Sequence, residues 1–182
     1  MEKRNYFISY HHSSNYTQLK ELRDKFGNKT FGDYGFKDEN LGEFSKQFIS
    51  KKIQWRLWSS SVTIVLIGEK TAESAWIDWE IWYSLQSYQD PNVSRRRYKP
   101  KGLLALYLPC NNPSVPERLQ QNIDSGYAVE IFWDEIDTHF NEKSTQAYKN
   151  RNNIHLIQNS IPLREEPKTQ FGNLSLKKLF NL

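Results

Sequence analysis

The sequence has few of the residues that cross-link a small protein or bind a structural metal. Cys110 is its one cysteine among 182 residues. A lone cysteine excludes an internal disulfide framework and a zinc site built from several cysteines. The four histidines lack zinc-ligand spacing, so we expect no metal site. A single thiol suits a reducing compartment, and we therefore expect a cytoplasmic protein.

Long apolar runs and common catalytic motifs are also missing. No segment approaches the length that crosses a bilayer, and the apolar run near Met1 is too short for a secretory signal, so we expect no membrane association. The absence of G-x-G-x-x-G, Walker and G-x-S-x-G sequences argues against a dinucleotide fingerprint, a P-loop and a hydrolase triad. The 25 basic and 21 acidic residues are too evenly mixed to predict nucleic-acid binding.

The main pattern in the sequence is a series of apolar runs that alternate with helix-like segments. Residues 62–67 and 102–108 are apolar without polar alternation, which is typical of strands buried on both faces of a parallel sheet. Other strands are expected at 6–10, within 29–36 and at 128–133. Helices are expected at 16–26 (ended by Gly27 and Asn28), 44–53, 74–89, 117–123, 140–150 and 174–182.

This order predicts an α/β fold: a flavodoxin-like, doubly wound sheet of about five mostly parallel strands, with a C-terminal helical extension. We assign residues 1–135 to the domain itself. Residues 136–182 are expected to form an extension packed on the same domain.

The topology also places a candidate site. In a flavodoxin-like sheet the first and third strands are neighbours, and ligands bind beyond their carboxyl ends. Helical spacing puts Trp76, Glu80 and Tyr83 on one face of the helix after the third strand. The residues expected across the crevice from them are Ser9, Tyr10, His11 and His12. A solvated glutamate on a helix whose aromatic residues pack on the sheet is an equally open interpretation at this point.

Other uses of this architecture fit less well. A phosphorylated receiver requires clustered acids after the first strand and a lysine after the last, where this chain has His11-His12 and Trp133-Asp134. A flavin binder requires a loop that lets the backbone approach phosphate, and H-H-S-S-N-Y-T lacks glycine. We keep a flavodoxin-type nucleotide binder as a distant alternative.

Three segments carry a family resemblance. They are Y-F-I-S-Y at residues 6–10, F-G-D-Y-G-F-K-D-E-N-L-G-E-F at 31–44, and S-V-T-I-V-L-I-G-E-K-T-A-E-S-A-W-I-D-W-E at 61–80. Together they resemble the first strand, the loop after the second strand and the W-x-x-x-E helix start of a TIR domain. The third segment looks most like the bacterial TIR-like proteins of Thoeris anti-phage defence. The resemblance covers about residues 1–135.

The resemblance implies an enzyme that cleaves NAD+ at the nicotinamide–ribose bond, an NAD+ glycohydrolase or ADP-ribosyl cyclase-like hydrolase. NAD+ would be its substrate, with no cofactor. The product would be a cyclic or conjugated ADP-ribose that diffuses to a partner effector. The positions that the resemblance assigns are Glu80 as the catalytic acid, Trp76 as the family tryptophan, Ser9, Tyr10 and His11 around the nucleotide, and a loop starting at Asp33.

Two questions stay open at this stage. Members of the family often carry a basic or small residue where this chain has His11-His12, so a phosphate contact, a base that steers the product, and an ordinary loop histidine are all possible. A non-catalytic TIR scaffold that acts by self-association also stays open, because the aromatic residues and the charged loop at 38–43 suit assembly. A homo-oligomer or a phage-derived trigger fits either case.

Overall fold

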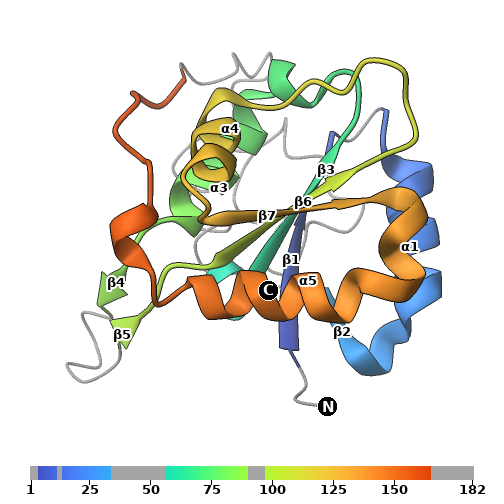
Figure 1. Ribbon diagram of the computed structural model, residues 1–182, viewed down its shortest axis with the longest axis horizontal. Helices are drawn as coiled ribbons and strands as arrows, with labels where there is room; N and C mark the ends of the chain where they lie inside the picture. The colour runs from blue at the N-terminus through green and yellow to red at the C-terminus, as the bar shows by residue number, and fades with distance from the viewer. Residues whose placement is uncertain (1–3, 12–13, 34–55, 90–96, 165–182) are drawn as a thin grey trace, which may run out of the picture.

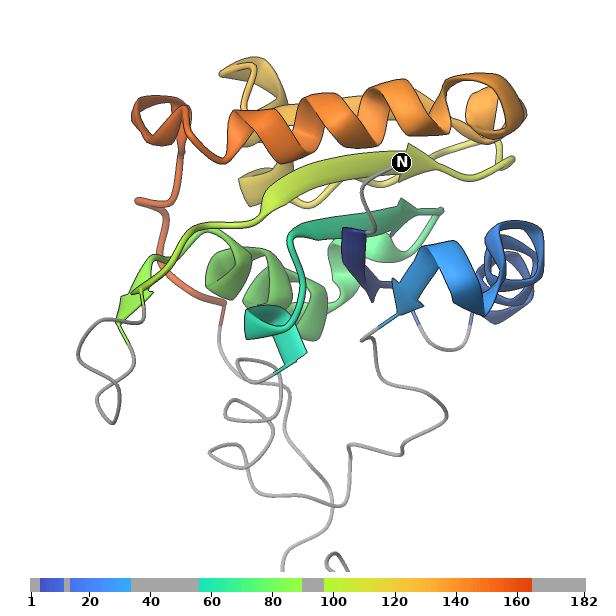
Figure 2. The same cartoon turned by 90° about the horizontal axis from the view of Figure 1, so that it is seen from below.

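The computed structural model describes residues 4–11, 14–33, 56–89 and 97–164, and their elements form three layers (Figures 1 and 2). Five strands of these residues make one sheet in the order β2-β1-β3-β6-β7, and every neighbouring pair is parallel. The strands are β1 (Arg4–Ser9), β2 (Phe31–Asp33), β3 (Val62–Ile67), β6 (Gly102–Tyr107) and β7 (Ala128–Phe132). The strand order is flavodoxin-like, so the predicted fold class is confirmed.

Central strand β3 shows why the sheet needs helices on both faces. All six of its residues are buried. Ile64 and Leu66 belong to one core cluster, whereas Val65 and Ile67 belong to the other. Side chains alternate along a strand, so a continuous apolar run supplies two cores at once.

Within the described part of the chain, helices lie against both faces of the sheet (Figure 1). The first core cluster lies against α1 (Tyr16–Thr30) and α5 (Ile136–Asn150), and the second lies against α3 (Ala75–Ser84) and α4 (Glu117–Asp124). Short turns η2 (Thr71–Glu73), η3 (Trp133–Glu135) and η4 (Ile154–Leu156) link some of these elements. No helix within the described ranges is both long and apolar enough to cross a membrane.

Three predicted helix boundaries were wrong: the end of α1, the end of α3, and the start of α5, which lies at Ile136 and not at residue 140. Helix α1 continues through Gly27 and Asn28 to Thr30 and leads directly into β2. The pairing of β2 with β1 fixes where the helix must end, and this tertiary constraint outweighs the local stop signal. Helices expected at 44–53 and 174–182 lie outside the described residues.

Helix α3 is shorter than expected because the chain after it forms a hairpin. The helix ends at Ser84, not near residue 89. Strand β4 (Tyr88–Gln89) then pairs antiparallel with β5 (Arg97–Tyr98). Trp58 stacks on Tyr88 with ring centroids 4.2 Å apart, so aromatic packing stabilises the extended segment.

The chain after α5 crosses back to the opposite face of the sheet. Figure 2 shows this segment, residues 151–164, running from the end of α5 past the sheet to α3. Its polar backbone is anchored by side chains of α4: Asn122 donates to the carbonyl of Gln158 and accepts from the Gln158 amide. We call residues 157–164 the C-terminal strap.

Candidate functional site

Two buried polar side chains meet where β1 ends. The Ser9 hydroxyl donates a hydrogen bond of 2.5 Å to Oε2 of Glu80. Ser9 is fully buried, and Glu80 is 7% exposed. Ser9 is paired in register with Val65, which belongs to the core beneath α3, so the serine points toward the face that α3 covers. The predicted proximity of the first strand's end and Glu80 is therefore present in the structure.

The rotation of α3 is fixed by contacts on both sides of Glu80. Ile77, three residues before the acid, and Ile81, directly after it, are both buried in the core. Ser84 donates to the backbone carbonyl of Glu80 at 2.7 Å and shares a 2.8 Å hydrogen bond with Thr63 of β3. These contacts hold the helix against the sheet, and they direct the glutamate inward.

The protonation of Glu80 follows from this location. Burial raises the pKa of Glu80 to about 8, while the Ser9 hydrogen bond and the positive charge of Arg56 lower it without cancelling the effect of burial. The free protein therefore holds Glu80 largely as the neutral acid at pH 7. A desolvated carboxyl with so perturbed a pKa is typical of a functional site.

Aromatic rings continue along α3 on either side of the acid. Trp76 and Trp79 meet edge to face with centroids 5.9 Å apart, and Trp79 and Tyr83 do so at 6.2 Å. Trp76 and Tyr83 are both half-buried. Helical spacing alone would turn Trp79 away from the other two, but in the structure its ring contacts both of them. Glu80 thus lies on a helix with partly accessible aromatic surface.

Other predicted residues follow β1, and they separate in the structure. Tyr10 packs against the core beneath α1 and α5, which is the face opposite Glu80. The Nδ1 of His11 shares a 2.8 Å hydrogen bond with the Ser14 hydroxyl before α1. His12 lies outside the described residues. Asp33 ends β2, and its side chain is not among those the structure describes.

No pattern in the sequence predicted the buried ion pair that the structure shows next to Glu80 on α3. Arg118 of α4 is 0% exposed, and its Nε donates to Oδ1 of Asp78 at 2.9 Å. The same guanidinium donates to the carbonyls of Ile161 and Pro162 in the C-terminal strap. No spacing rule links these segments, because the contacts join residues far apart in the chain. The pair ties α3, α4 and the strap together directly behind the candidate acid.

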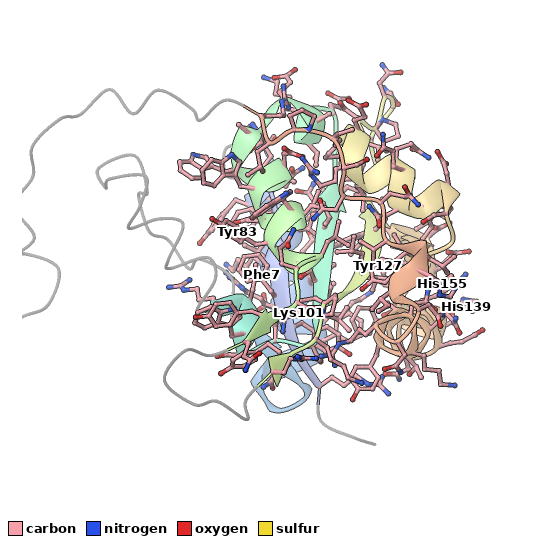
Figure 3. All side chains as sticks on the ribbon, turned by 90° about the vertical axis from the view of Figure 1, so that its left-hand side faces the viewer. Phe7, Tyr83, Lys101, Tyr127, His139 and His155 are labelled. Carbon is pink, nitrogen blue, oxygen red and sulfur yellow. The ribbon has the colours of Figure 1, made fainter. Side chains whose placement is uncertain are left out.

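The described residues contain no group of three or more histidine, cysteine, aspartate or glutamate side chains that could hold a metal ion. Figure 3 shows His139 and His155 on the side of the molecule away from Tyr83.

The fold and this site are those of a TIR-type α/β domain, with a W-x-x-x-E helix after the third strand of the sheet. A comparison with known protein families assigns the domain to one of them. Residues 7–112 match the family described as Thoeris protein ThsB, TIR-like domain. The match spans more than half of the chain and includes both Ser9 and Glu80. The chain belongs to this family.

Proposed function

We propose that the protein is a TIR enzyme of anti-phage defence that cleaves NAD+ at the nicotinamide–ribose bond. The observation that carries the proposal is the buried Glu80 carboxyl, which Ser9 holds at the end of β1 with a raised pKa. Membership of the Thoeris family supports the defence context. We place the reaction in the cytoplasm, since the single cysteine suits a reducing compartment.

The chemistry needs one well-placed acid. Cleavage breaks the bond between ribose C1′ and the nicotinamide nitrogen, and the electron pair leaves with neutral nicotinamide. Positive charge then develops on the ribose as an oxocarbenium ion. A carboxylate in a site with little water stabilises that charge strongly, because the surroundings screen it weakly.

Glu80 reaches its active form when the substrate arrives. The pyridinium ring of NAD+ is cationic, and a cation beside a buried acid favours the ionised carboxylate. Ser9 keeps the carboxylate oriented by donating to Oε2. The rings of Trp76 and Tyr83 offer surfaces on which a planar ring can stack.

Capture of the ribosyl cation would decide the product. Water gives ADP-ribose, an atom of the same nucleotide gives a cyclic product, and another small molecule gives a conjugate. We propose a cyclic or conjugated product that activates a partner effector by diffusion. Substitution of His11, followed by product analysis, tests whether this side chain takes part in the capture of the cation.

The direct test is product analysis during infection. Cells that express the wild type or Glu80→Gln are infected with phage, and nicotinamide and ADP-ribose derivatives are measured by mass spectrometry. We expect NAD+ loss and a new nucleotide in the wild type alone. Equal nicotinamide release in both strains would refute the catalytic assignment. Protection by Glu80→Gln, with assembly seen in light scattering, would favour the self-associating scaffold.

A further inference from the structure

A pocket lies at the far end of α3 from Trp76. It has a volume of about 280 Å³, and Glu80 is not among its lining residues. Its main walls are Trp58, Trp82, Tyr83, Tyr88, Tyr98 and Lys101. Figure 3 shows Tyr83 and Lys101 on the same side of the molecule. We call this the aromatic pocket.

Long-range packing builds the aromatic wall. The β4–β5 hairpin places Tyr88 opposite Tyr98. Trp58 stacks nearly parallel to both rings, with an interplanar angle of 17° in each case. Trp82 and Tyr83 of α3 meet edge to face at 4.8 Å. All five rings are half-buried, so they offer partly accessible planar surface.

Lys101 supplies the positive charge. Its backbone is anchored on both sides: the amide donates to the Ser84 carbonyl at 2.7 Å, and the carbonyl accepts from the Tyr127 hydroxyl at 2.8 Å. The residue is 3% exposed, and Nζ lies 5.8 Å from the centre of the Tyr98 ring.

Nothing in the described structure neutralises this amine. Burial, followed by the positive charge of Arg151, lowers the pKa of Lys101 to about 8. No carboxylate of the described residues forms a salt bridge with it. A buried cation without an acidic partner is unfavourable, and an anion bound beside it would offset that cost.

We propose that the aromatic pocket binds a small planar aromatic molecule that carries one anionic group. The ring stacks on the tryptophan and tyrosine walls, because a planar aromatic ligand offers its face to such side chains. The anion pairs with Nζ of Lys101, and Lys99 lines the same pocket. The volume is near the lower end of the ~300–1,000 Å³ typical of ligand sites, which limits the ligand to about the size of a nucleoside monophosphate.

Calorimetry with matched ligands tests the proposal. The phosphate arm compares AMP with adenosine and inorganic phosphate, and the carboxylate arm compares benzoate with neutral benzamide. We expect at least one anionic aromatic ligand to bind tenfold or more tightly than its neutral partner. Equal affinity for anionic and neutral partners in both arms, or no binding of any aromatic ligand, would overturn the proposal. The arm that shows the advantage identifies the anion as phosphate or carboxylate.

Substitutions test whether the ligand binds in the aromatic pocket. Lys101→Gln should abolish the advantage of the anion, whereas Trp58→Leu should weaken charged and neutral ligands alike. Glu80→Gln should leave binding unchanged, so this test stands apart from the proposed NAD+ chemistry. If Lys101→Gln still binds the anionic ligand more tightly than the neutral one, the assignment of Lys101 as the partner of the anion is contradicted.

A measurement on the folded wild type covers the case in which Lys101→Gln fails to fold. The anion's advantage should fall as pH rises through about 8, because Lys101 then loses its proton. Among the described residues, the other titratable groups around Lys101 are Tyr83, Tyr88, Tyr98, Lys99, Tyr127 and Arg151. If the anion's advantage still falls near this pH in Lys99→Gln, the titrating group is Lys101. An advantage that stays constant from pH 7 to 9.5 would exclude Lys101 as the partner of the anion.

Discussion

Glu80 is an acid held where water is largely excluded, and this environment has consequences that a single substitution can reveal. Its oxygen is hydrogen-bonded to Ser9, and its pKa rises from 4.5 to about 8 mainly through burial. The native state therefore binds a proton that the unfolded chain releases between these two pH values. Both stability and activity should depend on pH through this one group.

Glu80→Gln should stabilise the free protein at alkaline pH. Wild-type stability falls as pH rises from about 4.5 to about 8, because the folded state holds the proton more tightly than the unfolded state does. Glutamine removes this dependence at similar volume. Thermal unfolding at pH 5 and pH 8.5 should show a gap between variant and wild type that widens at high pH by a few kcal/mol, at about 1.4 kcal/mol per pKa unit. A gap that does not change with pH would contradict the raised pKa.

Ser9→Ala should move the pH profile of NAD+ cleavage. If ionised Glu80 is the active form, kcat/KM for the wild type rises with pH toward about 8. The Ser9 hydroxyl lowers the pKa of Glu80, so its removal should move the rise to higher pH, and each tenfold weakening of the acid lowers activity at pH 7 by about tenfold. Ser9→Thr keeps a hydroxyl and serves as the control. An activity loss without a displaced profile would point to a structural role for Ser9.

Contacts between secondary-structure elements leave no room for a side chain at one position. Strand β6 begins at Gly102, where helix α5 passes closely. A Cβ at this residue would lie 2.0 Å from the carbonyl oxygen of Ala147. The helix and the strand can approach this closely only because the glycine has no side chain.

Gly102→Ala should therefore destabilise the domain by about 2 kcal/mol or more, as overpacking at a rigid backbone does. Gly126→Ala is the comparison. That glycine has a φ of 78° but no atom within 4 Å of the added Cβ, so it should cost about 1 kcal/mol from backbone strain alone. Urea unfolding measures both. A larger loss for Gly126→Ala would show that α5 adjusts to the added methyl group.

Several of the secondary-structure elements were predictable from the sequence. The strands at 62–67 and 102–107 follow from continuous apolar runs. The end of α1 and the β4–β5 hairpin were not predictable, because strand pairing and the stacking of Trp58 on Tyr88 decide them. Contacts between distant segments carry no local pattern.

At the scale of the whole molecule, the C-terminal strap closes the structure behind the candidate site. Arg118 joins Asp78 on α3 to the strap carbonyls, and the Trp79 indole donates to the carbonyl of Arg164 at 3.2 Å. Asp78 and Trp79 directly precede Glu80 in the chain. The strap therefore stabilises the helix that positions the acid, although it lies beyond the residues matched to the family.

Truncation after Leu156 should lower both stability and NAD+ cleavage. It leaves the Arg118 guanidinium without the strap carbonyls, and unpaired buried donors cost about 1–3 kcal/mol each. Truncation after Arg164 keeps these contacts and is the matched control. Melting temperatures and nicotinamide release should fall in the first variant relative to the second. Equal behaviour of the two truncations would show that the strap does not support α3.

The sequence by itself determined the doubly wound fold, because apolar periodicity is a local pattern, and the W-x-x-x-E segment made Glu80 the candidate acid. The tertiary structure decided that Ser9 hydrogen-bonds Glu80 directly, that Tyr10 faces the opposite core, and that Arg118 and the strap hold α3. It also assembled the aromatic pocket around Lys101. These features depend on burial and on contacts across long stretches of chain, and both exist only once the layers have packed.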